Sequence, residues 1–181
     1  SGTLAISSAT AANPGIVWAE PFAITYGTAI SVMQLNAIST VDGAFSYSIP
    51  EGTVLNAGAA QAIIATFTPY DLVAYKQQSV TVNLDVNKDV LTVTASAKTK
   101  TYNGQVFTGY TSTITGLVNG DSSLVIGGSV SYSGTAITAT AAGSYVITPS
   151  VSGLSATNYS FDPISSTLTI AKATLTVIAS D

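Results

Sequence analysis

Near its end, the chain repeats a pattern that it has already shown once. Residues 170–180 follow the same order of apolar and polar side chains as residues 86–96. Lys172 aligns with Lys88, which gives an offset of 172 − 88 = 84 residues. A fixed period of this kind is typical of proteins built from tandem modules. The 181 residues of the chain have room for two modules of that length.

Within each module, apolar residues alternate with Thr, Ser and Asn, as they do in half-buried β-strands. In residues 80–86, three valines and a leucine occupy one face, and Thr81, Asn83 and Asp85 occupy the other. The same alternation predicts strands at 91–95, 167–170 and 174–177, and weaker patterns predict strands at 16–18, 45–49, 63–67, 111–115, 129–133, 136–139 and 144–148. No segment of helical length shows a 3.6-residue period, and residues 57–64 offer one helical turn at most.

Turn sequences separate these strands, among them Asp42-Gly43, Asn103-Gly104 and Asp162-Pro163. Short strands with a turn about every 8–12 residues are typical of a β-sandwich. We therefore predict an all-β chain that forms two tandem β-sandwich domains.

We expect two complete domains with a partial segment at either end. Residues 2–6 resemble residues 166–170, the strand that closes the second domain. The predicted bounds are 1–13 for the tail of a preceding repeat or a linker, 14–87 and 88–172 for the two domains, and 173–181 for the first strand of a next repeat. The junction 86–90 is short and lacks Gly and Pro, so we expect the domains in an elongated arrangement.

The predicted strand at 174–180 lacks the rest of its sandwich. Its unpaired backbone groups predict that it either frays or pairs with another copy of the chain. Apart from such pairing we expect a monomer, whose partners are the neighbouring repeats of the same chain.

Charge and residue types exclude several classes of function. The chain has five Lys, no Arg, no His and a net charge of −4, which opposes binding to nucleic acid or anionic lipid. No run approaches the roughly 18 apolar residues of a membrane-spanning helix. The absence of Cys and His removes disulfides, thiolate catalysis and the commonest catalytic bases and metal ligands. We expect no enzyme, no catalytic residues and no cofactor, with calcium as the one metal to consider.

The calcium hypothesis concerns the junction. In an extended chain Asp85, Asn87 and Asp89 would project oxygen atoms on one side, and Ca²⁺ takes roughly six to eight oxygen ligands. The alternative is a polar outer strand face with a solvated linker, since three ligands are too few.

Aromatic and lysine side chains suggest two further sites, each with a structural alternative. Trp18 and Tyr110 would bind a sugar if exposed, but large aromatic residues in sandwiches usually fill the core. Lys98 and Lys100 are candidates for an isopeptide crosslink, although their place beside a turn favours exposed, solvated positions. Tyr26, Tyr102 and Tyr159 lie next to Gly or in loops, and we expect them to pin turns through their hydroxyls.

Both domains resemble known bacterial repeats. The first resembles bacterial Ig-like repeats of the Tyr-Gly-Thr type, through residues 18–21, 24–28, 35–37, 52–58 and 67–71. The second resembles MBG or YDG domains, through residues 91–95, 102–104, 116–121, 142–149, 158–159 and 168–173. Asn103 stands where the YDG name has Asp.

The resemblance implies two Ig-like β-sandwich domains from a large adhesin that is secreted or held at the bacterial cell surface, hence extracellular. It implies no catalytic residues. The leading hypothesis is a structural stalk or spacer. The alternatives are a module that binds a carbohydrate or a protein receptor, and a spacer rigidified by calcium.

Overall fold

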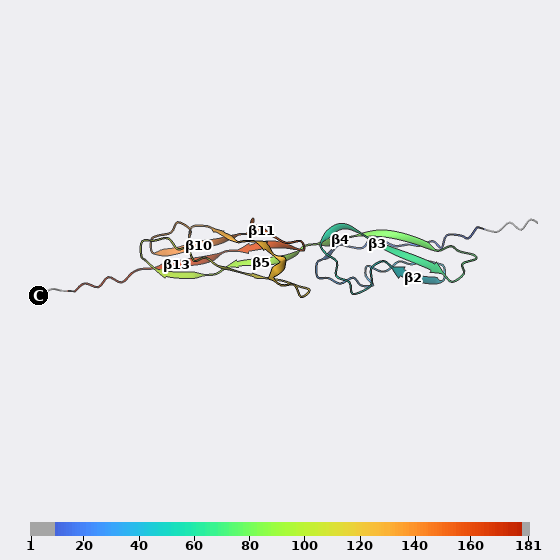
Figure 1. Cartoon of the computed structure of the whole chain (residues 1–181), viewed down its shortest axis with the longest axis horizontal. Coiled ribbons are helices and arrows are strands. Elements are labelled where there is room, and N and C mark those ends of the chain that lie inside the picture. The colour runs from blue at the N-terminus through green and yellow to red at the C-terminus, as the bar shows by residue number, and fades with distance from the viewer. Residues whose placement is uncertain (1–9, 179–181) are drawn as a thin grey trace, which may run out of the picture. The chain divides into compact units, whose positions relative to one another are not determined.

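The computed structural model describes residues 10–178, and in that range its regular structure is strands plus one short 3-10 turn, Ser123–Val125. The chain divides into two compact units, with the boundary between Lys88 and Asp89. Figure 1 draws the first unit in blue to green and the second in green to red. The predicted all-β fold class is confirmed. Residues 1–9 of the expected N-terminal tail, and 179–181 of the expected last strand, lie outside the described residues.

One four-stranded sheet forms the frame of the first unit. It contains β1 (Ile24–Thr25), β2 (Gly43–Tyr47), β3 (Gly58–Pro69) and β4 (Gln78–Asn87), in the order β1-β4-β3-β2. The long strands β3 and β4 are antiparallel neighbours (Figure 1). The predicted alternation on β4 is confirmed, since Val82 and Leu84 are buried whereas Asn83 is exposed.

Irregular chain covers the inner face of this sheet. This irregular chain contains two isolated β-bridges, which join Val17 to Ile38 and Ala29 to Val54. Its buried residues include Trp18, Ile30 and Ala37. The backbone of Ala12 exchanges hydrogen bonds with Ala74 and Lys76 (2.8 and 3.0 Å), so the bonded part of the unit begins before the expected bound at residue 14.

The second unit is a sandwich of two main sheets. One contains β5 (Asp89–Ala95), β7 (Ser112–Thr115) and β12 (Tyr159–Ile164), in the order β12-β5-β7. The other contains β6 (Lys98–Thr101), β9 (Ser131–Ser133), β10 (Gly143–Ser150) and β13 (Ser166–Ala171), in the order β6-β13-β10-β9. A two-stranded ladder joins β8 (Gly127–Gly128) and β11 (Leu154–Ser155). Leu91 and Val93 of the first sheet, and Ile147 and Leu168 of the second, are fully buried.

Both units close in the same way. A strand from the beginning of each unit pairs in parallel with its last strand: β1 with β4, and β6 with β13. In each case the next residue is a tyrosine whose backbone N–H donates to the final residue of the last strand, Tyr26 to Asn87 O (2.9 Å) and Tyr102 to Ala171 O (2.8 Å). The two acceptors lie 171 − 87 = 84 residues apart, which is the period of the sequence repeat.

Several local predictions are wrong. Residues 136–139 form a turn rather than a strand, in which Ala136 and Ala139 are buried. Residues 57–64 are not a helical turn, because β3 begins at Gly58. Asp162-Pro163 does not end a strand but lies inside β12, where Pro163 is tolerated because β12 is at the edge of its sheet.

The described part of the expected C-terminal strand, residues 173–178, has no strand structure. Leu175 and Val177 are 86% and 85% exposed, whereas the aligned Leu91 and Val93 are buried. Pairing of this segment with a second copy stays a prediction.

Candidate functional site

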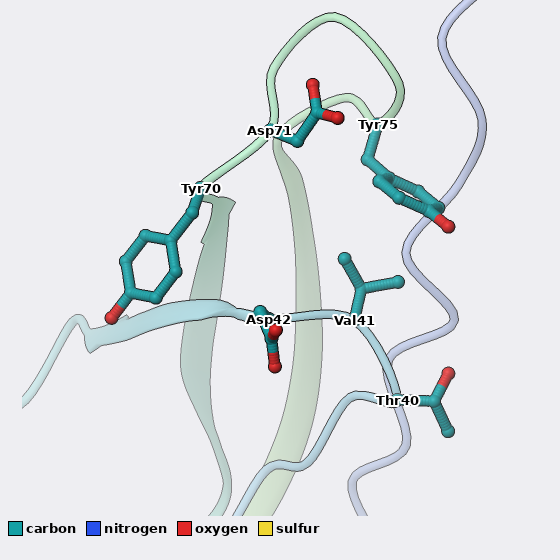
Figure 2. A pocket seen from close by; sticks show the side chains of 6 residues that line it. All are labelled: Thr40, Val41, Asp42, Tyr70, Asp71 and Tyr75. Atoms are coloured by element: carbon teal, nitrogen blue, oxygen red, sulfur yellow. The ribbon is translucent and has the colours of Figure 1, made fainter.

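A polar hollow of the first unit lies at the end of its sheet where β3 turns into β4. It has a volume of about 500 Å³ and is lined by Thr40, Val41, Asp42, Tyr70, Asp71 and Tyr75 (Figure 2). The first three residues precede β2, and the last three belong to the loop 70–77 between β3 and β4. We call it the β3–β4 hollow.

Hydrogen bonds fix the loop that forms one wall of the β3–β4 hollow. Asp71 Oδ1 accepts from the backbone N–H groups of Val73 and Ala74, both at 3.0 Å. The N–H of Tyr75 donates to Asp71 O, and that of Tyr70 donates to Asp42 O (both 3.1 Å). The second bond ties the loop to the opposite wall, so both walls hold a defined geometry.

The side chains of the β3–β4 hollow combine acids with aromatic rings. Tyr70 is 77% exposed, and in Figure 2 its ring and that of Tyr75 lie on either side of the Asp71 carboxylate. Asp42 lies below them in this view, and its carboxylate points down, away from that of Asp71. No lysine lines the hollow. Such a surface accepts hydrogen bonds from hydroxyl or amide donors and offers an aromatic face.

Sequence reasoning missed this site because Asp42 and Asp71 are common turn residues. The motif Phe67-Thr68-Pro69-Tyr70-Asp71 carries part of the family resemblance, and its residue types do not by themselves indicate a binding site. The juxtaposition of Asp42 with Asp71 depends on the pairing of β2 with β3, in which Gly43 faces Pro69.

The proposed calcium ligands are distributed over both units. Asp85 and Asn87 are exposed on β4, and Asp85 Oδ1 accepts from the N–H of Ala60 (2.7 Å). Asp89 begins β5 in the second unit, and its Oδ1 accepts from the N–H of Val90 (2.8 Å). Among the described residues, no group of three or more His, Cys, Asp or Glu could hold a metal ion. The calcium hypothesis stays a prediction.

The two proposed sugar-stacking residues lie in different units. Trp18 is 9% exposed, donates its Nε1–H to Gln34 O (3.0 Å) and meets the Tyr47 ring edge to face at 5.5 Å. Its ring is core, which leaves no face for a ligand. Burial raises the pKa of the Tyr47 phenol, and the N–H donated by Ala37 partly offsets that rise.

Tyr110 closes the core of the second unit. Its hydroxyl donates to Ala136 O (2.9 Å), and its ring packs between Phe107 and Tyr132 at centroid distances of 5.1 and 5.5 Å. Burial raises the pKa of its phenol. Tyr110 therefore packs against the core of the second unit.

Lys98 and Lys100 differ from the solvated pair that the sequence predicts. Both are half-buried on the same face of β6. The Lys100 ammonium donates to Asn103 Oδ1 (2.6 Å) and to Gln105 O, so it holds the turn that follows β6. The crosslink remains untested.

Tyr159 pins a turn, as the sequence predicts. Its side chain is 1% exposed, and its hydroxyl donates to Asp121 Oδ2 (2.7 Å) while accepting from the N–H of Val118 (3.1 Å). The bonds anchor the turn after β7 to the core of the second unit.

Comparison with known proteins gives one family match. Residues 91–169 match the model of the MBG domain (YGX type), which covers less than half of the chain. The predicted resemblance of the second unit is thus confirmed, whereas the Tyr-Gly-Thr type of the first unit stays a prediction. No curated protein matches the chain. No helix of the described residues has the length and apolar character that crossing a membrane requires.

Two crystal structures of Dscam1 N-terminal four-Ig-domain fragments are distantly similar. Isoform 9.44 has 12% identity and a TM-score of 0.38, with coverage of 91% of this chain and 47% of that chain. Isoform 4.44 has 13% identity and a TM-score of 0.32, with coverage of 88% and 46%. The chain spans about half the length of these structures. By its family match, the second unit is similar to an MBG domain of the YGX type.

Proposed function

We propose that this chain is a non-enzymatic, load-bearing spacer within a large bacterial surface or secreted adhesin. The observation that carries the proposal is the parallel pairing of early and last strands in both units. MBG-type repeats in surface proteins support the same role. The spacer places a binding partner at a distance from the cell and transmits tension without opening.

The strand directions explain how a unit would resist tension. Tension enters the second unit at Asp89, the start of β5, and leaves at Ala171, the end of β13. It pulls β6, which continues from β5, backward and pulls β13 forward. Because these strands are parallel, the pull slides one along the other and loads their hydrogen bonds together rather than one at a time.

The second unit has more residue pairs between parallel strands than the first unit. Four residue pairs join β6 to β13, from Lys98 with Leu168 to Thr101 with Ala171, and six further pairs join β5 to β12. In the described part of the first unit, the parallel pairing with the last strand is limited to Ile24 and Thr25, and the remaining partner of that strand, β3, is antiparallel. We expect the first unit to yield at the lower force.

The junction between the units supports a restricted joint. Only Lys88 lies between the end of β4 and the start of β5. On one side, Asn87 O accepts from the N–H of Tyr26 (2.9 Å); on the other, the N–H of Asp89 donates to Asn158 O (3.0 Å). The residues on either side of Lys88 are thus bonded within their own units, which leaves few free backbone dihedral angles.

Replacement in the parent protein tests the spacer role. We would exchange residues 14–171 for two unrelated β-sandwich domains of similar length and measure adhesion of the cells under flow. A spacer predicts that adhesion is kept with the replacement and falls with simple deletion. Loss of adhesion with the equal-length replacement would contradict the spacer role and favour a ligand-binding module.

A further inference from the structure

We propose that the β3–β4 hollow binds a neutral carbohydrate, with Tyr70 as the stacking surface and Asp42 and Asp71 as hydrogen-bond acceptors. This inference goes beyond the spacer role, which does not require a ligand. It differs from the sugar site that the sequence suggests, because Trp18 and Tyr110 are packed into the cores.

The hollow has the size and rigidity of a binding site. Its volume of about 500 Å³ lies within the usual range of roughly 300–1,000 Å³ for small-molecule pockets. The bonds from Asp71 to Val73 and Ala74, and from Tyr70 to Asp42, hold both walls before any ligand arrives. A preformed site loses little conformational entropy on binding.

Tyr70 supplies exposed aromatic area at the hollow, and two further exposed apolar residues of the same loop lie outside the lining. Tyr70 is 77% exposed, Leu72 60% and Val73 89%. Large apolar side chains gathered on one fixed loop mark an interaction surface more strongly than single exposed residues do. A sugar ring has an apolar C–H face that can lie on an aromatic ring while its hydroxyls form hydrogen bonds at the rim.

The charges of the hollow select among ligands. Two carboxylates without a lysine among the lining residues accept hydrogen bonds from neutral hydroxyls and repel uronic or sialic acids. A directly bound calcium ion is a poorer candidate. Asp71 Oδ1 already accepts two backbone N–H bonds, and two acids are few for an ion that prefers roughly six to eight oxygen ligands.

Glycan-array screening of the intact chain, followed by calorimetry with the best glycan, tests the site. Tyr70→Ala should weaken binding at least about tenfold, because it removes the main apolar contact. Asp42→Asn should weaken it several-fold through loss of a charged acceptor. Phe22→Ala is the matched control, since Phe22 is a 96% exposed aromatic residue of the same unit outside the hollow, and it should leave binding unchanged.

Each other outcome overturns the proposal. The proposal is wrong if the chain retains no neutral glycan on the array, or if it prefers acidic glycans. It is also wrong if Tyr70→Ala binds the glycan with the affinity of the wild type, or if a calcium chelator abolishes binding. Unchanged thermal melting of the variants shows that they are folded. A negative result here leaves the replacement test of the spacer role unaffected.

Discussion

Single hydroxyl groups do much to order the loops of this chain, as Tyr159 illustrates. Its place in a loop sequence predicts that its hydroxyl pins a turn, and in the structure it does so at the turn after β7. The identity of the partner could not be predicted, because Asp121 lies 38 residues earlier and meets Tyr159 only because β5 pairs with β12 on one side and with β7 on the other. Residue type predicts the role, and topology decides the contact.

Replacing Tyr159 by Phe should therefore destabilise the second unit without changing its shape. The substitution keeps the buried ring but leaves Val118 N–H and Asp121 without the hydroxyl, which costs about 1–3 kcal/mol. Urea unfolding monitored separately for each unit would measure the change. Tyr70→Phe, at an exposed position, is the control and should have almost no effect. An unchanged midpoint in Tyr159→Phe would show that the turn does not depend on this hydroxyl.

Strands were predictable where alternation is long and regular. The predicted strands that correspond to β4, β5 and β13 are confirmed. Along each of them, buried apolar residues alternate with more exposed polar residues. The prediction for 136–139 failed because this short segment, Ala-Ile-Thr-Ala, forms a turn rather than pairing with a strand. Ala136 and Ala139 are buried by packing of the core cluster and by the Tyr110 hydroxyl bond, not by pairing in a sheet.

The parallel pairs were beyond the reach of local sequence. Ile24–Thr25 and Lys98–Thr101 are short and carry no distinctive alternation, so only the repeat of a tyrosine after each strand hints at a common role. The β3–β4 hollow was unpredictable for a related reason. Its acids come from segments joined by the pairing of β2 with β3.

The edge of β4 has a specific protection. Before Val86, β4 has no strand partner on the side of β1 among the described residues. There the Glu20 carboxylate accepts from the N–H of Asn83 (3.0 Å). Charged groups at open edges prevent pairing with strands of other molecules.

Removing this carboxylate should expose the edge. We expect Glu20→Ala to show concentration-dependent association in sedimentation velocity, whereas the wild type does so less or not at all. Glu20→Gln keeps an acceptor for Asn83 and is the matched control, with an intermediate effect. Identical sedimentation of wild type and Glu20→Ala across concentrations would show that the edge is protected by other means.

For the molecule as a whole, the 84-residue repeat corresponds to a shared closure by parallel strands. The sequence predicts two units and a short junction, and in the proposed spacer role the parallel strand pairs are the parts that would bear tension. Asn87 and Asp89, on either side of Lys88, are each hydrogen-bonded within their own unit. Calcium at this joint remains a separate hypothesis, since a mechanical role based on strand pairing does not require an ion.

Stretching single molecules of the two-unit chain between its ends tests the load-bearing role most directly. Two separate unfolding steps are expected, with the second unit opening at the higher force and releasing about 280 Å of chain minus its folded span. Tyr102→Pro, which removes the N–H that bonds to Ala171 O, should lower that higher force; Tyr102→Phe, which keeps the N–H, should not. Opening of both units together, or at forces that Tyr102→Pro leaves unchanged, would contradict support by the parallel ladder.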